Sequence, residues 1–144
     1  MKVLIVNGPN LDRLDIRDSK IYGNLSYQEL SELVSNRARE LGFEPEIRQS
    51  NDESEIIGWL HEAADSLTPV IFNAAAFTHY SYAIRDAVSM LKAPLIEVHL
   101  SNPMSREDFR HTSVISGVAT GSIAGFGADS YLLALEAMRN LLRK

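Results

Sequence analysis

The stretch KVLIVNGPN, residues 2–10, sets the pattern on which the fold is built. Val3–Val6 is a β-branched apolar run of the kind that favours a strand. Asn7-Gly8-Pro9-Asn10 follows at once and ends it, because Gly and Pro are the strongest local breakers of regular structure. We therefore expect the chain to open with a strand that leads directly into a polar loop.

A first amphipathic segment follows this strand. Its apolar residues recur at the spacing of one helical face. Ser26 and Glu29 make a capping-box pattern near its start, and Gly42 follows its end. These signals together predict a helix over Leu25–Leu41.

Apolar runs and amphipathic segments go on alternating along the rest of the chain. We expect strands at Glu44–Gln49, Val70–Phe72, Leu95–Leu100 and Val118–Ile123, and helices over Glu53–Leu67, His79–Leu91 and Asp129–Leu142. Ser50 with Glu53 predicts a second capping box, and Thr78 is expected to cap the helix that begins at His79. This alternation indicates a single α/β domain over residues 1–144. Its predicted form is a flavodoxin-like three-layer sandwich, a five-stranded parallel sheet in the order 2-1-3-4-5 with helices on both faces.

Composition narrows the functional classes. The chain has 144 residues, no cysteine and a net charge of −5. Without thiols it has no disulfide, thiolate zinc site, iron–sulfur cluster or cysteine nucleophile, and no His, Asp and Glu cluster has metal-ligand spacing. Its Lys and Arg residues are scattered, which argues against a nucleic-acid partner. The apolar run near the N-terminus is too short for a secretory or membrane segment, so we expect a cytoplasmic protein without a membrane partner.

Polar residues follow several of the expected strands. In open parallel sheets, ligands bind outside the carboxyl ends of the strands, where the strand order reverses. Asn7–Asn10 follows the first strand, Asn73 follows the third, and Glu97, His99 and Ser101 lie at the end of the fourth. The sequence therefore predicts a ligand site at this edge of the sheet.

Glu97 and His99 form the first candidate constellation. Residues two apart on a strand share a face, so their side chains are expected to lie together, with Val98 and Leu100 on the packed side. A carboxylate beside an imidazole fixes its tautomer and favours its protonated form, which makes a general acid. The alternative is a structural histidine that caps the end of the strand.

Leu11–Asn24 is long for a connection between a strand and a helix. A polar loop over a ligand crevice is a candidate lid. Arg17 would favour the phenolate form of Tyr22, because a nearby cation stabilises an anion. A solvated loop with an ordinary tyrosine is the alternative.

Two further segments are candidates for ligand contact. The small residues after Asn73 permit close backbone approach, and His79 would lie near a helix N-terminus, where anions are favoured. A simple capped helix is the alternative there. One arginine of Ser105–His111 that reaches the crevice would bind a carboxylate or hydroxyls, whereas Arg85-Asp86 is interpreted as an exposed pair.

Taken together, these residues resemble the type II 3-dehydroquinate dehydratases of the shikimate pathway. The match spans nearly the whole chain in order. Its pieces are Asn7-Gly8-Pro9-Asn10-Leu11, Arg17, Ile21-Tyr22-Gly23, Arg48-Gln49-Ser50-Asn51, Asn73, Thr78-His79, Arg85-Asp86-Ala87, Glu97-Val98-His99-Leu100-Ser101-Asn102, Phe109-Arg110-His111 and Ile123-Ala124-Gly125-Phe126-Gly127.

The resemblance implies dehydration of 3-dehydroquinate to 3-dehydroshikimate, an anti elimination through an enolate that needs no metal or cofactor. Tyr22 would be the base, acting as a tyrosinate that Arg17 stabilises. Asn10 would hold a water molecule that stabilises the enolate. His99, oriented by Glu97, would protonate the departing hydroxyl.

The resemblance also implies how the substrate is bound. Its carboxylate and hydroxyls would be held by Asn73, His79, Arg110 and the backbone at Leu100 and Ser101. Asp86 would approach from a neighbouring subunit of a homododecamer, a tetramer of trimers.

Three segments depart from the family pattern. Ala74-Ala75 stands where Pro-Gly is usual, Leu14-Asp15-Ile16 where Leu-Gly-Thr is usual, and Pro103-Met104 where a β-branched residue and His are usual. We expect these departures to change rate or affinity and to leave the chemistry unchanged. The competing hypotheses are a non-catalytic flavodoxin-like module that binds a small acid, and a related lyase or isomerase that acts on another hydroxy acid.

Overall fold

A single parallel sheet organises the computed structural model, which describes residues 1–144. Its strands are β1 (Lys2–Asn7), β2 (Glu44–Gln49), β3 (Val70–Asn73), β4 (Leu95–His99) and β5 (Gly121–Ala124). They lie in the order β2-β1-β3-β4-β5, and every neighbouring pair is parallel. The expected strand order is confirmed, and β5 begins at the later half of the stretch expected for it.

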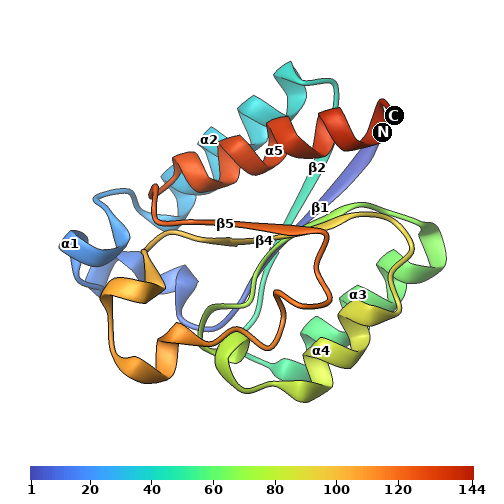
Figure 1. Ribbon diagram of the computed structural model, residues 1–144. Helices are drawn as coiled ribbons and strands as arrows, with labels where there is room; N and C mark the ends of the chain where they lie inside the picture. The colour runs from blue at the N-terminus through green and yellow to red at the C-terminus, as the bar shows by residue number, and fades with distance from the viewer.

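Helices cover both faces of this sheet (Figure 1). On one face lie α2 (Tyr27–Glu40) and α5 (Asp129–Leu142), and on the other lie α3 (Glu53–Ser66) and α4 (Tyr82–Ser89). A short helix, α1 (Ser19–Tyr22), and four 3-10 segments lie in the loops: η1 (Leu11–Ile16), η2 (Ala75–His79), η3 (Pro103–Ser105) and η4 (Asp108–His111). This is the expected three-layer, flavodoxin-like α/β arrangement.

The strand residues divide between two hydrophobic cores. Val3 and Ile5 of β1 are fully buried against α2 and α5, whereas Leu4 and Val6 pack in the core that α3 and α4 complete. This division follows from the alternation of side chains along a strand. Each fully buried side chain of this kind stabilises the fold by roughly 1.5–3 kcal/mol. The sheet is therefore a rigid support for the loops at its carboxyl edge.

The capping interactions differ in part from those expected. Ser26 Oγ accepts from the backbone N–H of Glu29 at 3.1 Å and Glu29 accepts from that of Ser26 at 3.1 Å, which confirms the capping box of α2. The prediction of a second capping box, formed by Ser50 and Glu53, is wrong. Asp52 caps α3 by accepting from the N–H of Ser54, while Glu53 accepts a hydrogen bond from Ser81 at 2.6 Å.

The helix expected over His79–Leu91 is shorter than predicted. It begins at Tyr82, and Ser81, not Thr78, caps it by accepting from the N–H of Ile84 at 3.1 Å. Residues up to His79 form the 3-10 segment η2 instead. The physical reason is that the Thr78 side chain is directed at Glu97 across the sheet edge, and the backbone becomes α-helical only after Ser81.

Both chain ends lie at the amino edge of the sheet (Figure 1). The strands carry the chain from there to the carboxyl edge, and α5 brings it back. None of the helices combines the length and the hydrophobicity that a bilayer span requires.

Candidate active site

The carboxyl edge of the sheet carries a pocket of about 110 Å³. Small pockets of this kind suit a ligand well below drug size. The loops after β1, β3 and β4 contribute to its wall, together with the segment that contains α1 and the segment that contains η4. Of the residues expected in the site, those that line this pocket are Asn10, Arg17, Tyr22, Asn73, His79, His99, Leu100, Ser101 and Arg110.

The lining of the pocket is strongly cationic. Arg17, Arg106 and Arg110 line it, and no carboxylate does, although the chain as a whole has a net charge of −5. Guanidinium groups bind carboxylates and other planar anions well because their N–H donors are fixed in a fork. The pocket is therefore suited to a small anion.

Tyr22 stands between two of these cations. Arg17 Nη2 donates to the phenol oxygen of Tyr22, and the guanidinium carbon of Arg17 lies 3.6 Å from the centroid of the Tyr22 ring. Arg106 Nη2 donates to the same oxygen at 2.7 Å. Burial, together with repulsion from Arg106 and Arg110, lowers the pKa of Arg17 from its ordinary value. The phenol oxygen of Tyr22 therefore lies in a strongly cationic part of the pocket, with two guanidinium donors on it.

The short helix α1 places Tyr22 in this position. Asp18 caps α1 by accepting from the N–H of Lys20 at 3.0 Å. Gly23 then ends the helix with φ of 88°, a conformation that glycine adopts without steric cost. The expected lid segment is thus ordered by local hydrogen bonds.

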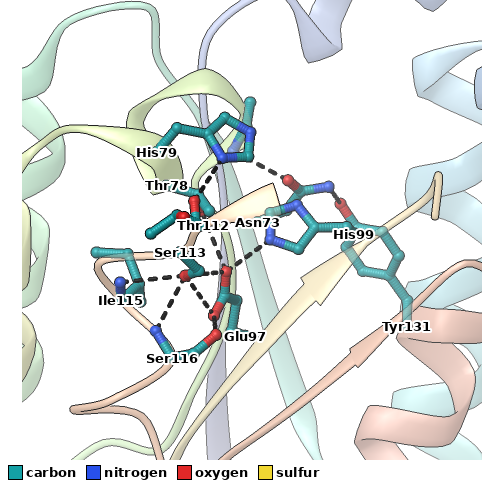
Figure 2. A network of polar contacts seen from close by, with 11 residues as sticks. Asn73, Thr78, His79, Glu97, His99, Thr112, Ser113, Ile115, Ser116 and Tyr131 are labelled. Carbon is teal, nitrogen blue, oxygen red and sulfur yellow. Dashed lines mark hydrogen bonds and ion pairs between the residues drawn. The ribbon is translucent and has the colours of Figure 1, made fainter. Parts of the chain in front are cut away.

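His99 and Glu97 lie side by side at the end of β4 (Figure 2). His99 Nε2 is 2.6 Å from Glu97 Oε2, and Glu97 is 1% exposed. Burial alone would raise the pKa of Glu97, but hydrogen bonds from His99, Ser116 and Ser113 hold it below its ordinary value. Since an ionised carboxylate only accepts, Nε2 donates, and Nδ1 of His99 is left for a ligand.

His79 presents a nitrogen that can accept a hydrogen bond. Its Nδ1 is 2.9 Å from the carbonyl oxygen of Thr112, and a carbonyl only accepts, so Nδ1 carries the proton (Figure 2). Burial lowers the pKa of His79, so the neutral ring is favoured. Its Nε2 is therefore suited to accept from a ligand hydroxyl.

A tyrosine of α5 holds the side chain of Asn73 in place. Its amide nitrogen donates to Tyr131 Oη at 2.9 Å, and its amide oxygen accepts from the N–H of Ala75 at 3.1 Å (Figure 2). Tyr131 Oη in turn donates to Asn7 Oδ1 at 2.5 Å. The loops after β1 and β3 are thus joined through one buried phenol.

The loop after β1 approaches the loop after β3 very closely. A β-carbon on Gly8 would lie 2.5 Å from the carbonyl oxygen of Ala74, so only glycine fits. Beyond it, Asn10 adopts φ of 70°, a left-handed conformation that Asn tolerates better than most residues. The backbone N–H of Asn10 donates to Asn51 Oδ1 at 2.9 Å. Asn51, the last residue of the Arg48–Asn51 segment, therefore helps to hold the backbone of Asn10 at the pocket.

Two parts of the expected site lie outside the pocket. Glu97 lies behind His99 and does not line it. Asp86 is exposed on α4 and does not line the pocket of its own chain. His, Asp and Glu side chains nowhere gather in groups of three that could hold a metal ion.

Sequence reasoning missed Arg106 and the hydroxyls around Glu97. We expected one arginine of the 105–111 segment in the crevice, but both Arg106 and Arg110 line it. No local pattern marked both, because Arg106 has extended backbone between two short 3-10 segments and the two arginines do not lie on one helix face. Ser113 and Ser116 carried no local signal, because they meet Glu97 only through the tertiary fold.

Comparison with known proteins gives a consistent picture. A sequence model of the family Dehydroquinase class II matches residues 1–139. A 3-dehydroquinate dehydratase of Salinispora tropica is 56% identical over 136 residues, covering 94% of this chain and 95% of the relative. A 3-dehydroquinate dehydratase of Mycobacterium tuberculosis is 50% identical over 134 residues, covering 93% of this chain and 91% of the relative.

A solved structure extends this likeness to three dimensions. The crystal structure of the type II dehydroquinase from Propionibacterium acnes superposes with a TM-score of 0.94 at 47% identity, covering 96% of each chain. These matches confirm the resemblance that the sequence motifs indicated. The chain belongs to the class II dehydroquinase family.

Proposed function

We propose that this chain dehydrates 3-dehydroquinate to 3-dehydroshikimate, the dehydratase step of the shikimate pathway, by an anti elimination in which Tyr22 and His99 act from different walls of one pocket. One observation supports this mechanism. Tyr22, whose phenol oxygen accepts from two arginines, and His99, which is hydrogen-bonded to a buried carboxylate, line the same pocket. A cationic pocket without a carboxylate in its lining suits the anionic substrate.

The first step is removal of a proton. Tyr22, ionised between Arg17 and Arg106, takes the proton from the carbon next to the ring ketone. The electron pair of that C–H bond moves toward the ketone oxygen and forms an enolate. Asn10 holds a water molecule that donates to this oxygen. Fixed donors aimed at developing charge lower the barrier without reorganisation.

The second step is loss of the hydroxyl. His99 in its protonated form donates a proton to the departing hydroxyl, which leaves as water. The enolate collapses to the conjugated enone as the C–O bond breaks. The negative charge of Glu97 stabilises the imidazolium before this transfer. Proton exchange with solvent then restores the tyrosinate and the imidazolium.

The remaining lining residues bind the substrate. His79, Asn73, Arg110 and the backbone at Leu100 and Ser101 hold its carboxylate and hydroxyls. Asp86 reaches the site of a neighbouring subunit from the exposed surface of α4, within a homododecamer that is a tetramer of trimers. Sedimentation velocity of the native protein tests this assembly, and fractionation of cells tests the expected cytoplasmic location.

The experiment that tests the function is a direct assay of the product. The purified protein, dialysed against a chelator, should generate the near-ultraviolet absorbance of the enone from 3-dehydroquinate. Tyr22→Phe should lower kcat by about 10²–10⁴-fold, the usual contribution of a positioned base, while substrate binding by calorimetry persists. Tyr27→Phe, a matched change outside the pocket, should stay active. Turnover retained in Tyr22→Phe rejects Tyr22 as the base, and binding without product favours the non-catalytic alternative.

A further inference from the structure

Four donors surround the carboxylate of Glu97 (Figure 2). Ser116 Oγ donates to Oε1 at 2.6 Å, and Thr78 Oγ1 donates to Oε2 at 3.2 Å. Ser113 Oγ lies 3.1 Å from Oε1 and 2.9 Å from Oε2, between the two oxygens. With His99 on Oε2, the acceptor capacity of the carboxylate is filled.

The hydroxyl of Ser113 has a fixed direction. Its oxygen accepts from the backbone N–H groups of Ile115 at 3.1 Å and Ser116 at 3.0 Å. A serine hydroxyl has one proton and two acceptor positions. Because both acceptor positions are used by the turn, the single proton points at Glu97.

The hydroxyl groups that donate to Glu97 carry no charge, so they leave its negative charge uncompensated. Its only ion-pair partner is His99. Hydroxyl donors stabilise the ionised carboxylate in a buried place without neutralising it. An arginine in the same position would have compensated the charge and left little for the imidazole. The negative charge of Glu97 is therefore available to a protonated His99.

We infer that Ser116, Ser113 and Thr78 are positioning residues of the dehydration: their hydroxyls keep Glu97 ionised and its Oε2 fixed, so that His99 is loaded with the proton it delivers to the leaving hydroxyl. This inference rests on the proposed function. The other titratable or charged groups facing this pair are His79 from η2 and Arg110 from η4, and they stay in place in the variants below.

Ser116 is the cleanest probe of this set. It is exposed apart from its bond to Glu97, whereas Ser113 also holds a turn and Thr78 is buried. In Ser116→Ala, the Glu97 anion loses one donor and its Oε2 is held less firmly against His99. We expect kcat to fall by about tenfold, the contribution of one hydrogen bond to a charged group, with KM within about twofold. Ser116→Thr should restore the wild-type kcat, and Ser66→Ala, which removes a hydroxyl on α3, should leave kcat unchanged.

A double-mutant cycle separates this role from a general structural one. In a Glu97→Gln background no charge remains for Ser116 to support, so Ser116→Ala should change kcat by less than about twofold. An equal effect of Ser116→Ala in both backgrounds, or a kcat of Ser116→Ala within about twofold of wild type, overturns the inference. A wild-type protein that forms no product overturns the proposed function instead, which keeps the two failures distinct.

Discussion

Tyr131→Phe removes a single oxygen atom, and we expect it to destabilise the protein strongly. The phenol lies between Asn7 and Asn73, and the three residues are 1%, 2% and 2% exposed, respectively. Phenylalanine keeps the ring and its packing but leaves Asn7 Oδ1 and the amide nitrogen of Asn73 without this partner. A buried polar atom left unpaired costs about 1–3 kcal/mol. With two such atoms, less the desolvation that the lost hydroxyl no longer incurs, we expect a loss of about 3 kcal/mol.

Urea unfolding followed by circular dichroism at a fixed protomer concentration measures this loss. The midpoint should fall while the slope m stays the same, which marks a change of stability without a change in the surface exposed. Burial raises the pKa of Tyr131, so the phenol remains a neutral donor over the whole working range of pH. The measurement is therefore free of titration of this group.

Tyr27→Phe is the matched control for this prediction. Tyr27 Oη also meets Asn7, but at 3.4 Å and in a partly buried place, so its loss should cost under about 1 kcal/mol. In Tyr131→Phe the unsupported Asn73 amide should also weaken substrate binding, seen as a higher KM. Equal stability of the two variants, or a loss below about 1 kcal/mol in Tyr131→Phe, would refute the reasoning.

Three further changes test other parts of the structure. Ala75 has φ of 52°, a left-handed conformation that costs a non-glycine residue about 1–2 kcal/mol. Ala75→Gly should therefore raise the free energy of unfolding by about 0.5–1 kcal/mol, seen as a higher urea midpoint, and a lower midpoint contradicts this. Because hydrogen bonds hold the pKa of Glu97 below its ordinary value, its contribution is complete above about pH 4.3 and is lost as pH falls further. Glu97→Gln should therefore show a shallower loss of stability in acid than wild type, and parallel curves would speak against it. Arg106→Gln removes one guanidinium donor from the Tyr22 oxygen, so kcat/KM for 3-dehydroquinate should fall by about tenfold or more; a value within about twofold of wild type would show that Arg17 suffices.

The fold was predictable from local signals. Val3–Val6 followed by Asn-Gly-Pro-Asn indicated a strand and its end, and similar runs repeated along the chain with helical segments between them. Strand order in such a chain is limited by the handedness and shortness of connections. The start of α4 was not predictable in the same way. Thr78 has the chemistry of a cap, but its side chain is directed at Glu97, nineteen residues further along the chain, and the helix begins only after Ser81.

The pair of Glu97 and His99 was more predictable from the sequence than the pair of Tyr22 and Arg106. Glu97 and His99 could be paired from spacing alone, because both lie on one strand. The importance of Tyr22 came from the family resemblance, since no local pattern distinguishes it from an ordinary loop tyrosine. Arg106 reaches Tyr22 across a sequence separation of 84 residues, and such a contact depends on how two loops close over the sheet.

The position of the two chain ends has a practical consequence. Both lie at the edge of the sheet away from the pocket, so in the protomer an affinity tag on either end stays clear of the chemistry (Figure 1). Because both ends lie at the same edge, a flexible Gly/Ser bridge from Lys144 to Met1 would close the backbone into a ring. New ends could then be opened at Gly42, in the turn between α2 and β2, to give a circular permutant whose substrate-binding loops are untouched.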